Sequence, residues 1–144
     1  MRLPAPVPGL VIRYAYLWRD EALRGQEEGV KDRPCVVILA VETAGGDRVV
    51  TVAPITHAPP RHPETAIEIP AASTRRLGLD GERSWIIAAD LNRFVWPGVD
   101  LRPVTPGSGR FDYGLLPASL YLAVKERVLA LARSGKLSST ARHP

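Results

Sequence analysis

Short apolar segments separated by turns that contain Gly or Pro make up most of the chain, and this pattern is typical of a mainly β protein. Residues 9–18 carry closely spaced apolar and aromatic side chains and are expected to form the first strand. Residues 34–42 are nearly all apolar, which predicts a central strand. The turn Ala44-Gly45-Gly46-Asp47 then leads into an antiparallel partner over 48–53, because glycine allows the positive φ that tight hairpins need. Further strands are expected over residues 65–69, 84–89 and 90–96.

Two segments have the pattern of helices. Residues 117–134 place apolar side chains at helical spacing, and Gly135 follows as a terminator. Residues 70–77 begin with proline and are followed by Gly78, which predicts a short internal helix. The apolar stripe expected on the longer helix consists of Leu120, Ala123, Val124, Val128 and Leu131.

The remaining segments lack a regular pattern. Residues 17–32 are rich in charge and are expected to form a solvated loop with room for one helical turn near residues 20–24. Residues 54–63 contain four prolines and predict an irregular loop. The other expected irregular segments are an extended arm over residues 1–8, a surface insertion over 97–116 and a disordered tail over 136–144.

These elements fit a single domain of 144 residues, and a hydrophobic composition of 45% is sufficient for a compact core. Short strands with one internal and one C-terminal helix predict a mainly β fold with α-helices, arranged as a small antiparallel β-barrel. Trp85 is expected in the core. Phe94 and Trp96 could either pack there or form a platform for base stacking.

The net charge of +4 comes mainly from arginine. Guanidinium groups match phosphate oxygens, although many proteins with this net charge bind no nucleic acid. Cys35 is the only cysteine and lies in an apolar run, which favours a small buried side chain over a nucleophile. The sequence shows neither an apolar signal region nor a run long enough to span a membrane, so it predicts a cytoplasmic protein without a membrane partner.

The first candidate for function is the junction between the charged loop and the central strand. The polar residues 25–32 run directly into Arg33, Pro34 and the apolar strand. Pro34 restricts the residue before it to an extended conformation, which fixes where the guanidinium of Arg33 emerges. Arg33 can therefore hold a phosphate. The alternative is a surface ion pair with Glu27, Glu28 or Asp32.

A second junction has the same design. The apolar residues 49–53 end at Pro54, and Ile55, Thr56 and His57 follow. Thr56 can hydrogen-bond a phosphate or simply close a turn. His57 is a candidate general acid or base, because histidine titrates near neutral pH. A histidine in a loop rich in proline is, however, often only exposed, and the same applies to His62.

Taken in order, these motifs resemble those of MazF/PemK-like toxins, the growth inhibitors of type II toxin–antitoxin systems. The resemblance covers roughly residues 9–96, together with Gly114-Leu115-Leu116 at the start of the last helix. The stretches that carry it are Gly9-Leu10-Val11, Gly25-Gln26-Glu27, Arg33-Pro34-Cys35-Val36-Val37, Val52-Ala53-Pro54-Ile55-Thr56, Gly78-Leu79, Ser84-Trp85-Ile86-Ile87 and Asp90-Leu91-Asn92-Arg93.

The resemblance implies an SH3-like barrel that forms a homodimer and acts as a metal-independent, sequence-selective endoribonuclease on single-stranded RNA. It implies a cognate antitoxin, no cofactor and no DNA substrate. The family's arginine before proline corresponds to Arg33, and its hydroxyl residue after the third strand corresponds to Thr56. The acidic residue that opens the family's late-strand motif corresponds to Asp90. The chain departs from the family at Lys31-Asp32, at His57 and in the insertion that begins at about Pro97.

Cleavage of RNA without a metal needs a base for the 2′-hydroxyl proton, a cation for the charge on the phosphorane and an acid for the leaving oxygen. Arg33 is predicted to be the cation, Thr56 to orient the phosphate and His57 to transfer a proton. Asp90 has two possible roles. It could orient Arg33 or a histidine, or it could simply form a hydrogen bond within a turn.

Glu27, Lys31 and Arg93 are predicted to bind the substrate. No metal site is predicted, since no His or Cys spacing matches zinc. The alternative function is a noncatalytic β-barrel of the same fold that binds RNA or a peptide.

Overall fold

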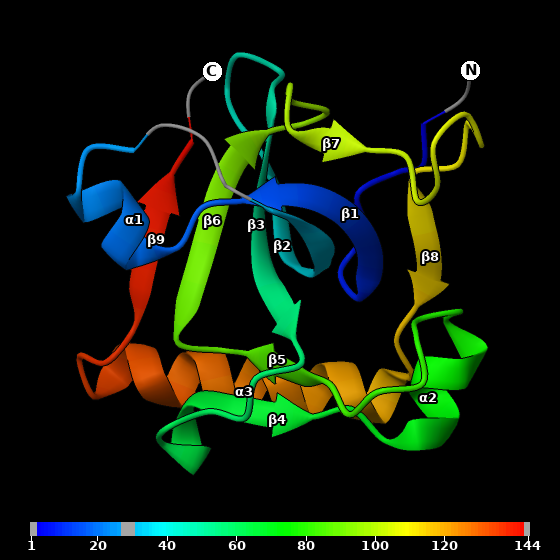
Figure 1. The fold of residues 1–144 in the computed structure, drawn as a ribbon. Helices are drawn as coiled ribbons and strands as arrows, with labels where there is room; N and C mark the ends of the chain where they lie inside the picture. Colours follow the sequence, from blue (N-terminus) through cyan, green and yellow to red (C-terminus); the bar gives the residue numbers. More distant parts are fainter. Residues whose placement is uncertain (1–2, 27–30, 143–144) are drawn as a thin grey trace.

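The computed structural model describes residues 3–26 and 31–142, which fold into a mostly antiparallel sheet accompanied by three α-helices (Figure 1). A 3₁₀ turn lies at Pro63–Thr65. In chain order the other elements are β1 (Leu10–Tyr16), α1 (Arg19–Leu23), β2 (Lys31–Glu42), β3 (Arg48–Thr56), β4 (Ala66–Glu68), α2 (Ala71–Arg76), β5 (Trp85–Ile87), β6 (Asp90–Val95), β7 (Leu101–Arg102), β8 (Asp112–Leu115), α3 (Ala118–Arg133) and β9 (Ser138–Ala141).

β1, β2 and β3 form an antiparallel meander at the centre of the sheet. β2 pairs with β1 on one side and with β3 on the other, and its apolar middle is buried. The β2–β3 turn is the predicted hairpin, in which Thr43 N donates to Asp47 O at 2.7 Å and Gly46 has a φ of 88°. The helical turn expected near residues 20–24 is also confirmed, as α1.

The sheet is open and does not close into a barrel. Its main path is β4-β5-β3-β2-β1-β7, while β6 pairs with β3 and β9, and β8 pairs with β1. Within the described residues, no pairing joins β7 or β8 to β4 or β9. The mainly β fold with α-helices is confirmed, whereas the SH3-like barrel is not. Alternation of apolar and polar residues could not decide this, because it defines the faces of a sheet and not its closure.

Two clusters of buried side chains hold these elements together. One includes Val36, Ile86 and Val128 and joins the sheet to α3, which Figure 1 shows running behind β4 and β5. The other is rich in aromatic residues, and in it the rings of Tyr14 and Phe94 stack 4.5 Å apart. Each cluster stabilises the fold through apolar area removed from water.

Several sequence interpretations concern these clusters. Trp85 and Phe94 are buried, and Trp96 packs against the aromatic cluster, so these side chains serve the core. Cys35 is fully buried, and burial raises the pKa of its thiol. On α3 the stripe is confirmed at Val124, Val128 and Leu131, whereas Leu120 is half-buried and Ala123 is exposed. No helix in the described part of the chain is long and apolar enough to cross a bilayer.

Two strands extend beyond their predicted ends. β2 begins at Lys31, so that Lys31 pairs with Tyr16 and Arg33 pairs with Tyr14. β3 continues through Pro54 to Thr56 because its end pairs with β5. The charged and proline-containing residues at these ends suggested loops, but backbone pairing with a neighbouring strand outweighs that local preference.

The structure also corrects the expectations for the insertion and the tail. Residues 97–116 contain β7 and β8, which both pair with β1. Residues 138–141 form β9, which runs parallel to β6, and Thr140 is buried. β9 could not be predicted from its sequence, which is rich in Ser and Thr, because an apolar pattern is the main signal for a strand. This strand is held by backbone hydrogen bonds.

Candidate functional site

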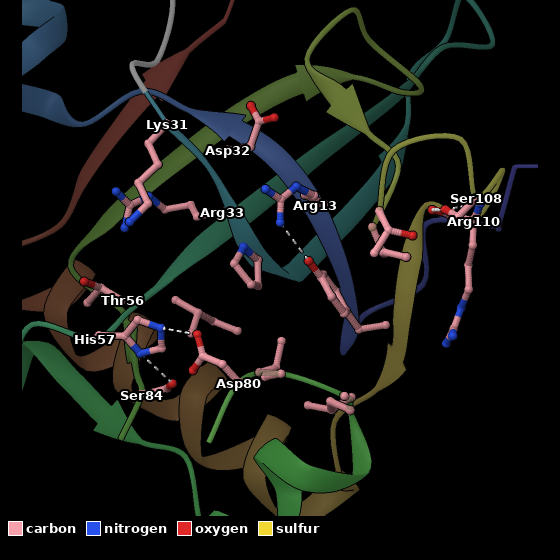
Figure 2. A pocket seen from close by; sticks show the side chains of 18 of the residues that line it. Arg13, Lys31, Asp32, Arg33, Thr56, His57, Asp80, Ser84, Ser108 and Arg110 are labelled. Carbon is pink, nitrogen blue, oxygen red and sulfur yellow. Dashed lines mark hydrogen bonds and ion pairs between the residues drawn. The ribbon is translucent and has the colours of Figure 1, made fainter. Parts of the chain in front are cut away.

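A cleft of about 900 Å³ opens beside β1, the start of β2 and the end of β3 (Figure 2). Its floor and walls also include residues before β5 and residues between β7 and α3. The polar residues that line it are Arg13, Lys31, Asp32, Arg33, Thr56, His57, Asp80, Ser84, Thr105, Ser108, Arg110 and Tyr113. Three predicted catalytic residues, Arg33, Thr56 and His57, therefore share one cleft.

The strand register explains why the two predicted junctions meet. Cys35 of β2 lies opposite Pro54 of β3. Arg33 lies two residues before Cys35, and Thr56 lies two residues after Pro54. Since paired antiparallel strands run in opposite directions, both residues reach the same end of the hairpin.

Four lysine and arginine side chains line the cleft: Lys31, Arg33, Arg13 and Arg110. Figure 2 shows Lys31, Arg33 and Arg13 on the side facing His57 and Asp80, with Arg110 toward the far end. Within residues 3–26 and 31–142, no ion pair joins any of these four to an acidic residue. The cleft therefore offers positive charge to an anionic ligand.

Arg33 is half-buried, and an aromatic ring supports it. The carbon of its guanidinium lies 5.2 Å from the centre of the Trp18 ring, within the range of a cation–π contact. Its Nε is buried without a hydrogen-bond partner in the described chain. Asp32, one predicted partner, instead approaches Arg102 at 3.7 Å. The other two, Glu27 and Glu28, lie outside the described residues.

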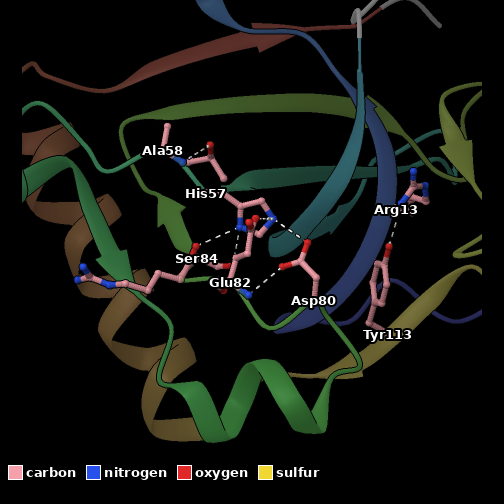
Figure 3. A network of polar contacts seen from close by, with 9 residues as sticks. Arg13, His57, Ala58, Asp80, Glu82, Ser84 and Tyr113 are labelled. Carbon is pink, nitrogen blue, oxygen red and sulfur yellow. Dashed lines mark hydrogen bonds and ion pairs between the residues drawn. The ribbon is translucent and has the colours of Figure 1, made fainter.

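His57 has partners at both ring nitrogens (Figure 3). Nδ1 lies 3.0 Å from the Arg83 carbonyl and 3.3 Å from Ser84 Oγ, and Nε2 lies 2.8 Å from Asp80 Oδ2. The hydrogen bond to the Arg83 carbonyl, with further contributions from Asp80 and Glu82, raises the pKa of His57 above its ordinary value of 6.5. This geometry favours an imidazolium, whose two N–H groups both meet acceptors.

Thr56 occupies the position expected for it, beside His57. Its Oγ1 accepts a hydrogen bond from Ala58 N at 3.1 Å, so the side chain does close a turn. The hydroxyl hydrogen is a separate donor and can still reach a ligand, because a hydroxyl both accepts and donates. The two alternatives for Thr56 are thus compatible.

Three side chains near the cleft could together hold a metal ion. His57, Asp80 and Glu82 each place one ligand atom within 4.8 Å of the others. All three are exposed, and contacts of Nε2 with Asp80 at 2.8 Å and Glu82 at 3.6 Å account for the cluster as ion pairs. Spacing along the chain gave no indication of this group, since the two acidic residues follow His57 by more than twenty positions.

Two predicted site residues do not line the cleft. Asp90 accepts hydrogen bonds from the Tyr16 hydroxyl and from Arg19 N, and burial raises the pKa of its carboxyl group. These contacts correspond to the structural alternative for Asp90. Arg93 is exposed on β6 and donates to Ser139 Oγ at 2.9 Å. β6 lies on the far side of β3 from β2, which separates Arg93 from Arg33. Glu27 lies outside the described residues.

Sequence reasoning missed several residues of the cleft. Asp80 and Ser84 hold His57, while Arg13, Arg110 and Tyr113 come from other parts of the chain. The signal for Arg13 was a lone charge inside an otherwise apolar strand. The others gave none, because only the tertiary fold brings their segments together.

Together the fold and the cleft define a small, mostly antiparallel β protein with a cationic site for an anionic ligand. Residues 16–94, more than half of the chain, match the family described as PemK-like, MazF-like toxin of type II toxin-antitoxin system. The chain belongs to this family, which confirms the resemblance and implies a toxin–antitoxin system. A comparison with curated proteins found no match.

Proposed function

We propose that this chain is a toxin that cuts single-stranded RNA at short preferred sequences in the cytoplasm, without a metal ion. The observation that carries the proposal is the meeting of Arg33, Thr56 and His57 in one cationic cleft. Family membership supports the same activity. A cognate antitoxin and a second copy of the chain are the proposed protein partners.

In the proposed reaction, the 2′-oxygen of a ribose attacks the adjacent phosphorus, and the bond from phosphorus to the next 5′-oxygen breaks. One product ends in a 2′,3′-cyclic phosphate and the other begins with a 5′-hydroxyl. DNA has no 2′-hydroxyl and therefore is not a substrate. An all-deoxy strand of the same sequence should remain intact, and its cleavage would rule out this chemistry.

Arg33 and Thr56 are assigned to the phosphate. The guanidinium can donate two parallel hydrogen bonds to phosphate oxygens and offset the charge that develops in the transition state. The contact with Trp18 limits the motion of Arg33, so less ordering is needed when substrate binds. Thr56 would donate its hydroxyl hydrogen to a phosphate oxygen beside that guanidinium.

His57 and Asp80 are assigned to proton transfer. The Arg83 carbonyl holds Nδ1, which leaves Nε2 as the atom that gives its proton to the departing 5′-oxygen. Asp80 would accept the proton of the 2′-hydroxyl. The 2.8 Å contact between Nε2 and Asp80 then offers a direct path that returns the proton to His57 after the products leave.

A noncatalytic RNA-binding protein is the second candidate. Both His57 nitrogens already have partners, and this observation favours the noncatalytic candidate. A substrate would have to displace Asp80 before Nε2 could contact the substrate. Incubation of purified protein with a mixed-sequence RNA in the presence of EDTA separates the two functions. Cleavage that persists in EDTA and leaves cyclic phosphate ends supports the ribonuclease, and binding without cleavage supports the alternative. Loss of cleavage in EDTA would contradict the metal-independent reaction and implicate the cluster of His57, Asp80 and Glu82.

A further inference from the structure

Residues 103–113 form a wall of the cleft, although they lie outside the part of the chain that matches the toxin family. Val104, Thr105, Ser108 and Arg110 line the cleft from this wall, and Tyr113 continues it into β8. Arg13, which faces the same space, also precedes the matched residues. Residues 103–113 and Arg13 therefore contribute to the cleft from outside residues 16–94.

Hydrogen bonds within the wall fix the position of Arg110. Val104 N donates to Arg110 O at 2.7 Å, and Arg110 N donates to Ser108 Oγ at 3.2 Å. Gly107 and Gly109 have φ values of 75° and 70°, which let the chain turn back between these contacts. The backbone of Arg110 is thus held, while its side chain is exposed and available to a ligand.

Arg13 is positioned by the same part of the chain. Its Nη1 donates to the Tyr113 hydroxyl at 3.3 Å, as Figure 3 shows. The backbone of Arg13 pairs with Pro34 of β2 on one side and Arg102 of β7 on the other. A tyrosine hydroxyl orients the guanidinium without neutralising it, so Arg13 keeps its full charge toward the cleft.

The acidic residues of the cleft do not offset these cations. Asp32 approaches Arg102, and Asp80 pairs with His57. In Figure 2, Arg13 lies between Arg33 and the wall, and Arg110 lies on the wall itself. Positive charge at two places along one cleft suits a ligand with more than one phosphate, because each phosphate can meet a separate cation.

We propose that Arg13 and Arg110 each meet a further phosphate of the ligand, so that the cleft holds single-stranded RNA across more than one phosphate. The inference rests on the proposed function, since it assigns the ligand of the same cleft. Arg33 holds the phosphate that reacts, and Arg13 and Arg110 each hold another. A short RNA with a single phosphate meets Arg33 alone.

The test measures RNA binding without cleavage. The probes are a fluorescent hexanucleotide and a dinucleoside monophosphate, both made of 2′-O-methyl RNA so that the attacking hydroxyl is blocked. Affinities are measured over a series of salt concentrations for Arg110→Gln, Arg13→Gln, Arg33→Gln and the control Arg133→Gln. Arg133 is exposed at the end of α3 and does not line the cleft.

Arg110→Gln and Arg13→Gln are each expected to weaken hexanucleotide binding by roughly two- to fivefold. Each should also flatten the plot of log affinity against log salt by about 0.7, the value for one phosphate contact on a single strand. Binding of the dinucleoside monophosphate should stay unchanged in both variants and weaken in Arg33→Gln. Arg13→Lys, which keeps the charge, should retain most of the salt dependence and so separates charge from a disturbed β1.

The proposal is overturned if Arg110→Gln and Arg13→Gln bind the hexanucleotide as Arg133→Gln does while Arg33→Gln still weakens it. That result would leave the proposed ribonuclease intact and remove only the phosphate contacts of Arg13 and Arg110. If the wild-type chain binds neither RNA, or if Arg33→Gln changes nothing, the proposed function fails together with this inference.

Discussion

At the scale of the residue, Arg33 is supported by the ring of Trp18 and not by a described carboxylate. Arg33→Ala is therefore expected to lower the rate of RNA cleavage by about 10²- to 10³-fold, as for loss of one group that stabilises transition-state charge. The melting temperature should change little, because no buried ion pair is broken. Initial rates on a labelled RNA and a thermal melt measure both effects, with Arg133→Ala as the control. Cleavage near the wild-type rate would refute the role of Arg33.

The titration of His57 provides a second test at this scale. Its pKa is raised by the Arg83 carbonyl and then by Asp80, so NMR should find it above 6.5, and Asp80→Asn should lower it. Because the pKa of His57 is higher in the folded chain than in the unfolded chain, protonated His57 stabilises the fold. This contribution is fully present at pH below about 6.5 and disappears as the pH rises through the folded-state pKa. Asp47→Asn, at the exposed β2–β3 turn, should leave the titration unchanged. An identical His57 pKa in Asp80→Asn would show that the pair does not form.

At the scale of the element, prediction from sequence succeeded where apolar side chains define the strand. The β2–β3 hairpin has apolar strands and a Gly-Gly turn, and both signals are local. β9 could not be predicted in this way, since its residues are Ser138, Ser139, Thr140 and Ala141. Its strand forms because β6 offers a parallel partner and because Arg142, one residue further on, enters the protein.

Arg142 anchors the end of β9 in a buried polar network. It donates to Asp100 Oδ2 at 2.9 Å, to Asn92 Oδ1 at 3.2 Å and to the Ala15 carbonyl, so it joins β9 to β6, β1 and the segment before β7. Arg142→Ala would leave the buried carboxylate of Asp100 without this cation. We expect a loss of about 3–5 kcal/mol in the free energy of unfolding, measured with urea.

The matched control for this network is Arg61→Ala. Arg61 is exposed in the loop after β3, and its replacement should change the free energy of unfolding by no more than about 0.5 kcal/mol. Equal stability of Arg142→Ala and Arg61→Ala would show that β9 is not anchored by this side chain.

At the scale of the whole molecule, the sequence predicted which two strand junctions meet but not what surrounds them. Arg33 and Thr56 could be paired because a single hairpin relates them. Asp80 and Arg110 could not, since their positions depend on how distant loops pack around that hairpin. Asp90 and Arg93 were expected at the site from a sequence motif alone, and their strand runs on the other side of β3.

The cationic cleft also predicts how an antitoxin would act. An acidic antitoxin segment that binds the cleft would occupy the same cations as RNA, so the two ligands should compete. Purified cognate antitoxin is expected to displace a labelled 2′-O-methyl RNA from the toxin, and Arg33→Gln should weaken both complexes. Antitoxin that binds equally well to protein saturated with RNA would place its main contacts elsewhere.

The assembly of the chain is tested separately. The proposed homodimer predicts twice the mass of one chain in light scattering at micromolar concentration, and a monomeric mass would contradict it. The large apolar side chains left exposed include Leu122 and Leu129, which lie two helical turns apart on α3. Leu122→Glu combined with Leu129→Glu would show whether this face of α3 takes part in the dimer.

The contact between Arg33 and Trp18 also gives the cleft a built-in optical reporter. The emission of an indole responds to a charge placed over its ring, and the guanidinium of Arg33 lies 5.2 Å from the centre of that ring. A phosphate that draws Arg33 toward the cleft would therefore alter the fluorescence of Trp18. With Trp85 and Trp96 replaced by Phe, ligand binding could be followed in the unlabelled protein, in real time and beside the residue proposed to meet the phosphate.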